Sequence, residues 1–187
     1  ILREAVRYLR STGATTIRVP RRSWNQGEAD QNAEPGVWGA GFDKVHQSRI
    51  DLIASVLSQA VPPKLYLIQT GGYCRKAAEH WAILDQVEAV RRWNGILVGP
   101  NWQCLVADGV VHHGIDGVLQ MALTEAWAVA ETEAGRAWNL LPPAAPIARS
   151  GNTITIPITI RGDETLTTEP GKYANYGGDP ANLGLEV

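Results

Sequence analysis

Apolar residues recur along this chain with two different spacings, and the two kinds of segment alternate. The helical spacing, with apolar residues three and four positions apart, predicts helices over residues 1–10, 42–59, 76–93 and 116–133. Short apolar runs bounded by Pro or Gly predict strands over residues 15–19, 64–69 and 95–99. Strands that alternate with helices are typical of βαβ units, so we expect a parallel sheet with both faces covered.

The same pattern indicates which side of two helices faces the core. The residues expected to point inward are Val45, Leu52, Ile53 and Val56 in the helix over 42–59, and Val118, Met121, Ala122 and Val129 in the helix over 116–133. Three strands make a thin sheet, because five or six are typical. The chain also opens inside a helical pattern, so we interpret it as part of a longer doubly wound α/β protein, with a shortened chain as the alternative.

The pattern changes after Pro142 and Pro143. Residues 152–160 alternate Thr and Ile, which is the period of a half-buried strand, and Pro157 suggests a strand at a sheet edge. Residues 162–187 are rich in Gly, Thr, Asn and Pro, as turns and short strands are. We therefore expect an α/β domain over residues 1–142 and a small β-rich appendage over residues 143–187.

The composition of the chain indicates which classes of binding partner are disfavoured. The 187 residues carry 17 Lys and Arg against 19 Asp and Glu, a net charge of -2 that favours neither nucleic acid nor an anionic membrane. The sequence has no apolar run long enough to span a bilayer. Cys74 and Cys104 are either one disulfide or two buried thiols, and we favour thiols. Seven Trp against one Phe suggest carbohydrate contacts or, more commonly, core packing.

Two polar loops are expected at the carboxyl ends of strands, where open parallel sheets bind ligands. The first runs from Trp24 through Gln26, Gly27 and Glu28 to Asp30, and the second covers residues 108–113, from Asp108 to a His-His pair. A carboxylate beside a histidine orients the ring and raises its basicity, which makes a general base for a serine hydroxyl. The side chain of Gln26, or backbone N–H groups around Gly27, would suit an oxyanion site.

Each of these features also has a plainer interpretation. A histidine pair such as His112 and His113 is commonly a solvated pair, and a Gln-Gly-Glu sequence is commonly a turn. Adjacent histidines point in different directions and no further ligand stands at a diagnostic spacing, so we predict no metal at Asp108, His112 and His113, and no cofactor. The other two histidines, His46 and His80, lie inside helical patterns and are expected to be structural.

The two loops together resemble the SGNH/GDSL hydrolase superfamily, and within it the sialate O-acetylesterase-like group that includes the family 6 carbohydrate esterases. The third sequence block of that group reads Trp-(His or Tyr)-Gln-Gly-Glu-(Ser or Ala)-Asp, and residues 24–30 fit it except for Asn25. Its last block is Asp-x-x-His with a glycine five residues later. Gly117 lies five residues after His112, which favours His112 over His113, although Asp108 lies four residues before His112 and a one-residue bulge must be assumed. Gln86 also falls where such proteins often carry Gln.

The resemblance covers residues 1–135 and implies a three-layer, flavodoxin-like α/β/α fold, of which this chain contains the C-terminal half. It implies that His112 is the general base and Asp108 its orienting acid, with Glu28 as an alternative or additional acid. It also implies that Gln26 and Gly27 shape the oxyanion hole, with Trp24 beside the substrate.

The family's nucleophile block, a Gly-x-Ser turn after the first strand, and its second block are both missing. Ser11 follows a helix, Ser23 lies inside the third block, and Cys74 is better interpreted as a buried thiol than as a nucleophile. The function that the resemblance implies is therefore part of a serine esterase that removes O-acetyl groups from carbohydrate, with the serine on an upstream segment or a separate chain.

The alternative comes from another class: a non-catalytic structural or glycan-binding module, as in bacteriophage tail and fibre proteins, in a homo-oligomer or virion assembly. A metal hydrolase is a third option. The sequence predicts no cellular address, although the resemblance favours an extracellular or virion-associated one.

Overall fold

The computed structural model describes residues 1–30, 33–70, 81–101, 112–138, 146, 148–155 and 157. The chain divides into two compact units, Ile1–Asn101 and Trp102–Val187, and each is described by itself. Cys74, His80, Cys104 and Asp108 lie outside the described residues.

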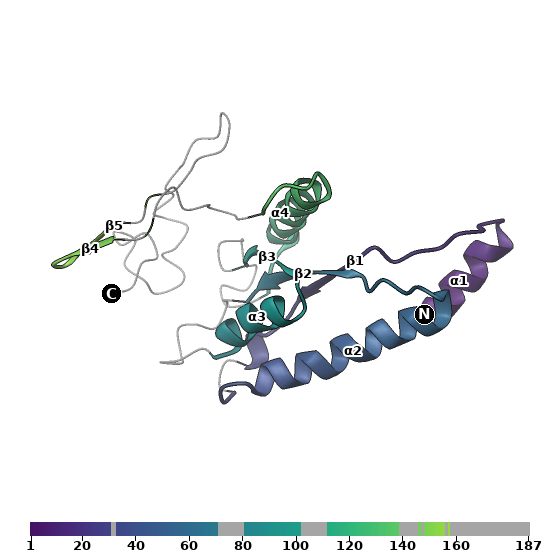
Figure 1. The fold of residues 1–187 in the computed structure, drawn as a ribbon, viewed down its shortest axis with the longest axis horizontal. Coiled ribbons are helices and arrows are strands. Elements are labelled where there is room, and N and C mark those ends of the chain that lie inside the picture. The colour runs from purple at the N-terminus through teal and green to yellow at the C-terminus, as the bar shows by residue number, and fades with distance from the viewer. Residues whose placement is uncertain are drawn as a thin grey trace. The chain divides into compact units, whose positions relative to one another are not determined.

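The first unit is an α/β structure around a parallel sheet (Figure 1). Its elements in chain order are α1 (Leu2–Ser11), β1 (Arg21–Asn25), the 3₁₀ turn η1 (Glu28–Asp30), α2 (Val37–Leu57), β2 (Lys64–Gln69), α3 (Trp81–Arg92) and β3 (Ile96–Pro100). The described strands are ordered β1-β2-β3 and both pairs are parallel. The predicted α/β class, with βαβ units around a parallel sheet, is confirmed.

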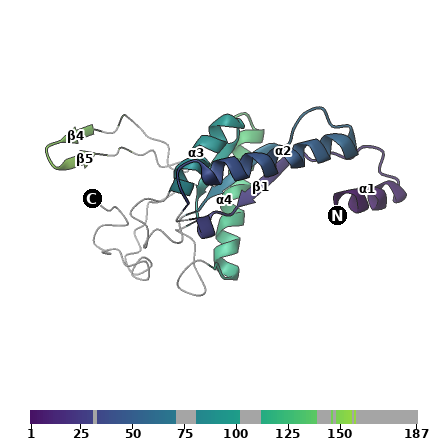
Figure 2. The ribbon, with the colours of Figure 1, turned by 90° about the horizontal axis from the view of Figure 1, so that it is seen from below.

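The core of this unit lies between β2 and the two helices that follow β1 and β2. Helices α2 and α3 lie side by side (Figure 2), and their buried residues surround Leu65 and Leu67 of β2. Tyr66 and Ile68 alternate with these leucines and are equally buried. Because neighbouring strand residues point to opposite faces, β2 is buried on both faces, as expected for a parallel sheet. The three-layer arrangement that the resemblance implies stays a prediction.

The first strand begins later than predicted. It covers Arg21–Asn25, after Pro20, and not residues 15–19. Pro20 cannot donate a backbone hydrogen bond, but its carbonyl accepts from the N–H of Lys64 at 2.9 Å, and the ladder with β2 starts there. In the segment over residues 15–19, where the strand was predicted, Val19 is hydrogen-bonded to a side chain and not to another strand. The Gln59 carboxamide accepts from the N–H of Val19 at 2.9 Å and donates to its carbonyl at 3.0 Å. A polar sequence therefore forms the strand, and Trp24 and Asn25 lie within it.

The second helix begins five residues before the predicted start, and a different face is buried. Val45 and Leu52, predicted to face inward, are 40% and 39% exposed, whereas Ile53 is buried as predicted. The buried face carries a row of rings at positions i, i+4 and i+8: Phe42 stacks on Trp38 at 5.0 Å and on His46 at 5.2 Å between ring centroids. Large aromatic rings bury more apolar area than Val and Leu, which explains why the face with the rings is the buried one.

The start of α2 is capped by a residue of another helix. Asp85 of α3 accepts the backbone N–H of Gly36 at 3.0 Å and that of Gly39 at 2.9 Å. A carboxylate at this end satisfies free N–H donors and opposes the positive end of the helix dipole. This tertiary contact places the first turn where the sequence, with Gly36, Gly39 and Gly41, gave little helical signal.

The remaining elements lie close to their predicted ranges. Strand β2 has the predicted bounds, β3 is displaced by one residue, and the described part of the predicted helix over 76–93 is α3.

The second unit contains α4 (Ile115–Glu133) and an antiparallel hairpin of β4 (Ala148–Ser150) and β5 (Thr153–Thr155). Met121 of α4 is buried as predicted, but Val118 and Ala122 are exposed, so the inward face of α4 was predicted only in part. The strand predicted over 152–160 is described over Thr153–Thr155, and the appendage over residues 143–187 stays a prediction. None of the described helices is both long and apolar enough to cross a membrane.

Candidate functional site

The three parallel strands end at one edge of the sheet, and polar residues follow each of them. Asn25 ends β1, Thr70 follows β2, and Asn101 follows β3. Thr70 and Asn101 are fully buried. The backbone N–H of Asn101 donates to the carbonyl of Gln69 at 2.8 Å and so joins β3 to β2 at this edge. Buried polar side chains at the carboxyl edge of a parallel sheet are where α/β proteins bind ligands.

Glu28 is held at this edge by two donors. The Asn101 side-chain Nδ2 donates to Glu28 Oε1 at 2.6 Å, and also to the Asn25 side-chain oxygen at 3.2 Å. The backbone N–H of Gly27 donates to Glu28 Oε2 at 3.1 Å. Hydrogen bonds to a charged acceptor are stronger than neutral ones, so the carboxylate is fixed between the loop after β1 and the end of β3.

Gln26 is bound on three sides. Its side-chain Nε2 donates to Asp30 Oδ2 at 2.9 Å, its Oε1 accepts from the Trp38 indole at 3.3 Å, and its backbone carbonyl accepts from Gln86 Nε2 at 3.0 Å. The side-chain conformation of Gln26 is therefore set by the loop and by α2, and its main chain is set by α3.

Gln86 is the residue whose role sequence reasoning missed. It is fully buried on α3, donates to the carbonyl of Gln26 and accepts from the N–H of Thr70 at 2.9 Å, so it ties the ends of β1 and β2 together. The resemblance indicated only that a Gln is common at this place. A signal for this role is present in the sequence, because the helical spacing places the Gln86 carboxamide on the same face of α3 as the core residues Ala82 and Ala89.

Gly27 is required by its surroundings. Its φ is +155°, and a Cβ at this position would lie 2.6 Å from Gln86 Nε2 and 2.8 Å from Thr70 Cγ2. No side chain fits there without displacing the residues that hold the loop. The N–H of Gly27 is bound to Glu28, so the oxyanion role predicted for Gln26 and Gly27 stays a prediction that requires one of these donors to turn toward a substrate.

Trp24 points toward α2 from the middle of β1. Its ring packs edge-on against Phe42 at 5.1 Å between centroids and borders the core. Two guanidinium groups lie over it, those of Arg22 at 4.9 Å and Arg49 at 5.6 Å from the ring centroid. The ring is half-buried, and its predicted place beside a substrate is not tested by these contacts.

The two candidate base residues precede α4 in the second unit. His112 is exposed and His113 is half-buried, and Gly114 is the N-cap residue of α4. Asp108 falls outside the described residues. Because Glu28 belongs to the first unit, a triad that contains both Glu28 and His112 stays a prediction. In the described ranges, no three His, Cys, Asp or Glu residues lie close enough together to hold a metal ion.

His46 lies in the core, stacked on Phe42 and 4.6 Å edge-on from the ring of Trp93. Its Nδ1 is hydrogen-bonded to Nη1 of the buried Arg22. Burial, and then the positive charge of Arg22, lower the pKa of His46 from 6.5 to about 4, so the ring is neutral at pH 7. Since Nδ1 accepts a hydrogen bond, the ring proton lies on Nε2.

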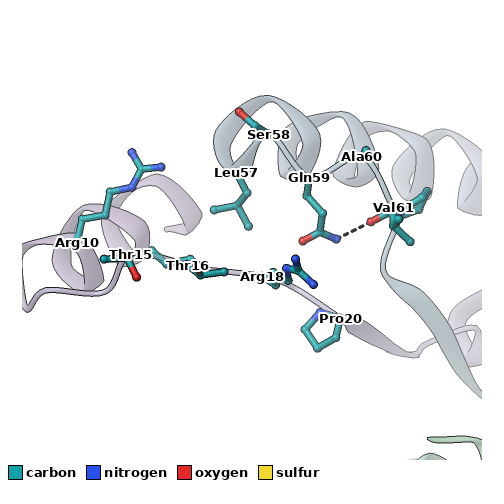
Figure 3. A pocket seen from close by; sticks show the side chains of 12 residues that line it. Arg10, Thr15, Thr16, Arg18, Pro20, Leu57, Ser58, Gln59, Ala60 and Val61 are labelled. Atoms are coloured by element: carbon teal, nitrogen blue, oxygen red, sulfur yellow. Dashed lines mark hydrogen bonds between the residues drawn. The ribbon is translucent and has the colours of Figure 1, made fainter.

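A separate cavity of about 640 Å³ lies near the opposite ends of the strands, between the segment that leads into β1 and the end of α2 (Figure 3). Arg10, Arg18 and Gln59 are among the residues that line it. None of the predicted site residues lines this cavity.

The fold and the edge residues define an α/β protein with a fixed carboxylate at the carboxyl edge of a parallel sheet. No protein-family model, no curated protein and no solved structure matches the chain. The resemblance to the esterases therefore rests on the two sequence blocks alone.

Proposed function

We propose that this chain carries part of the active site of a serine esterase that removes O-acetyl groups from carbohydrate. The observation that supports it most is the Glu28 carboxylate, fixed by Gly27 and Asn101 at the sheet edge within the Gln-Gly-Glu motif. A catalytic acid needs a fixed position, and part-buried hydrogen bonds from the loop after β1 and from the residue after β3 supply it.

In the proposed reaction a serine on an upstream segment or companion chain attacks the acetyl carbonyl. His112 takes the serine proton and gives it to the sugar oxygen as the ester C–O bond breaks, so the sugar leaves as the free hydroxyl and acetyl-serine remains. Water then attacks the acetyl-serine with the same histidine as base, acetate is released, and the serine oxygen regains its proton from the histidine. Each oxygen of Glu28 carries one described hydrogen bond, which leaves room for a further donor such as an imidazole N–H. In this proposal Asp108 is the acid that orients His112, and Glu28 suits the role of an alternative or additional acid.

The test combines a mass measurement with a rate. Mass spectrometry of the native material is expected to find a companion segment with a Gly-x-Ser turn, and the material is expected to release acetate from an O-acetylated sugar. His112→Ala is expected to lower kcat/KM by about 10³-fold or more, whereas the neighbouring His113→Ala, the matched control, is expected to change it by less than about threefold. Unchanged acetate release by the His112→Ala variant, or no serine-bearing companion, would contradict the proposal.

The second candidate is a structural or glycan-binding module without catalysis. The hydrogen bonds of Gln26 and Glu28 favour it, because both side chains bind residues of their own unit, as structural residues do. In that case the native material releases no acetate, and Glu28→Gln lowers stability without any effect on a reaction. A symmetric assembly in which Gln26, Glu28 and His112 face a protein neighbour would support this candidate.

A further inference from the structure

Arg22 is a charged residue inside the first unit. It lies on β1, opposite Leu65 of β2, and only 9% of its surface is exposed. Its side chain shares a face of the sheet with Trp24, two residues along the strand, and this face packs against α2. A buried charge is expensive unless hydrogen bonds and an opposite charge surround it.

One edge of the Arg22 guanidinium has no partner. Nη1 is hydrogen-bonded to His46 Nδ1, whereas Nε and Nη2 are buried and no acceptor lies within reach of either in the part of the chain that the structure describes. The Nε–H and one Nη2–H point to the same side of the planar group. Together they form the two parallel donors that bind both oxygens of one carboxylate or phosphate.

A third donor close by is also unsatisfied. The indole Nε1 of Trp24, whose ring centre is 4.9 Å from Arg22 Cζ, is buried and has no hydrogen-bond partner among the described residues. The unsatisfied groups around Arg22 are therefore N–H donors. A ligand that satisfies them must be rich in acceptors, and water or a hydroxyl would leave the charge uncompensated.

The local charge is positive. The second guanidinium, that of the exposed Arg49, lies over the same indole ring. Asp43, an acid whose charge acts on the neighbouring His46, is engaged elsewhere: its oxygens accept from Trp93 Nε1 at 2.7 Å and from Arg92 Nη2 at 2.9 Å. Burial and the nearby Arg49 lower the pKa of Arg22 to about 10, which leaves it charged at pH 7, and His46 is neutral there.

We propose that Arg22, with Trp24 and Arg49, forms a binding site for an oxyanion that presents two oxygens to the free edge of the Arg22 guanidinium. The ligand is a free small anion or the carboxylate of an acidic side chain from another polypeptide segment. The site is separate from the carboxyl edge, since Arg22 and Trp24 lie within β1 and face α2. Its occupation would join β1 and α2 by charge and raise the stability of the first unit.

The test measures melting temperature against concentration of acetate, inorganic phosphate and a short peptide with one Glu, at constant ionic strength set with chloride. At about tenfold excess over Kd the wild-type chain is expected to melt about 3–6 °C higher. Arg22→Lys keeps the charge but lacks the two parallel donors, and is expected to lose this increment. Arg21→Lys, the adjacent exposed arginine on the same strand, is the matched control and is expected to keep it.

A direct readout covers the case in which Arg22→Lys folds poorly. In ¹⁵N NMR spectra of the wild-type chain, the anion is expected to shift the Nε–H resonance of Arg22 and the indole N–H resonance of Trp24. Acetate and phosphate that bind as tightly as the peptide indicate a free anion, and a peptide that binds at least tenfold tighter indicates an acidic side chain. An equal rise in melting temperature in the Arg22→Lys variant, or no shift of these two resonances with any of the three probes, would overturn the proposal.

Discussion

Gly27 shows how one residue can be fixed by its neighbours. Its backbone angle and the atoms that surround its Cα leave no space for a side chain, because Gln86 and Thr70 both approach it from the core side. Gln86 also donates to the carbonyl of Gln26 and accepts from the N–H of Thr70, so a side chain at position 27 would disturb the hydrogen bonds that join the ends of β1 and β2. The Gly in the Gln-Gly-Glu motif therefore has a packing reason that is independent of any catalytic one.

We expect Gly27→Ala to lower the free energy of unfolding by about 2–4 kcal/mol, through a clash and an unfavourable φ. Urea unfolding measures it. Gly41→Ala is the control: a Cβ there meets nothing within 4 Å on the exposed side of α2, so it should raise stability by up to about 1 kcal/mol. Equal effects of the two changes would show that the packing around Gly27 is not as described.

His46 makes stability depend on pH. In the unfolded chain its pKa is near 6.5, and in the folded chain it is lowered to about 4, so between these values the unfolded state binds the extra proton. The contribution of neutral His46 is complete above pH 6.5 and is lost as the pH falls toward 4. At about 1.4 kcal/mol per pKa unit, the shift from 6.5 to about 4 corresponds to a loss of about 3 kcal/mol by pH 4.

His46→Gln should remove this part of the pH dependence, because Gln cannot take up the proton while its carboxamide oxygen can still accept from Arg22. Urea unfolding of both proteins from pH 7 to pH 4 measures the difference in slope. Parallel curves would mean that His46 titrates normally in the folded state.

At the scale of elements, α2 and α3 depend on each other. The row of rings from Trp38 to His46 packs toward the sheet, while Asp85 of α3 caps the first turn of α2 through two backbone N–H groups. The bound carboxylate stabilises the first turn of α2, while the row of rings determines which face of the helix is buried.

Asp85→Ala should lower the free energy of unfolding by about 1–2 kcal/mol, the usual effect of losing a helix cap. Glu88→Ala, on the same helix, removes only an exposed ion pair with Arg91 and should change stability by less than about 0.5 kcal/mol. Thermal or urea unfolding of the two variants measures both changes in the free energy of unfolding. A loss no greater for Asp85→Ala than for Glu88→Ala would rule out a capping role.

At the scale of the whole molecule, the proposed function assigns a catalytic role to a residue of each unit, Glu28 in the first and His112 in the second. Two residues that act in one triad do not contribute independently to catalysis. A rate measurement can therefore test whether the two residues act together.

In material that releases acetate, Glu28→Gln and His112→Ala are expected to lower kcat/KM separately, by about 10²-fold and at least about 10³-fold. The double variant should be no slower than His112→Ala within about threefold, because the second loss is already included in the first. If the loss in kcat/KM of the double variant equals the product of the two single losses, the two residues act independently. Lys44→Ala, an exposed change on α2, serves as the control and should leave the rate unchanged.

Several elements could be predicted because their signals are local. The apolar run over residues 64–69 is a strand with the predicted bounds, and the helical spacing located most of α2, α3 and α4. β1 could not be predicted, because Arg21-Arg22-Ser23-Trp24-Asn25 has no apolar run. It becomes a strand through pairing with β2, which is a contact between residues more than 40 positions apart.

For the candidate site, the sequence by itself determined which residue types stand at the ends of the strands, including the Gln-Gly-Glu motif and the His-His pair. It also determined the α/β class, because apolar periodicity is a property of neighbouring residues. Only the tertiary structure decided that Glu28 is held by Asn101 and that Gln86 ties β1 to β2. It also decided that Arg22 is buried with one edge of its guanidinium unsatisfied. These are contacts between distant segments, and the physical reason is burial: a polar group inside a protein takes its partners from whichever segments pack around it.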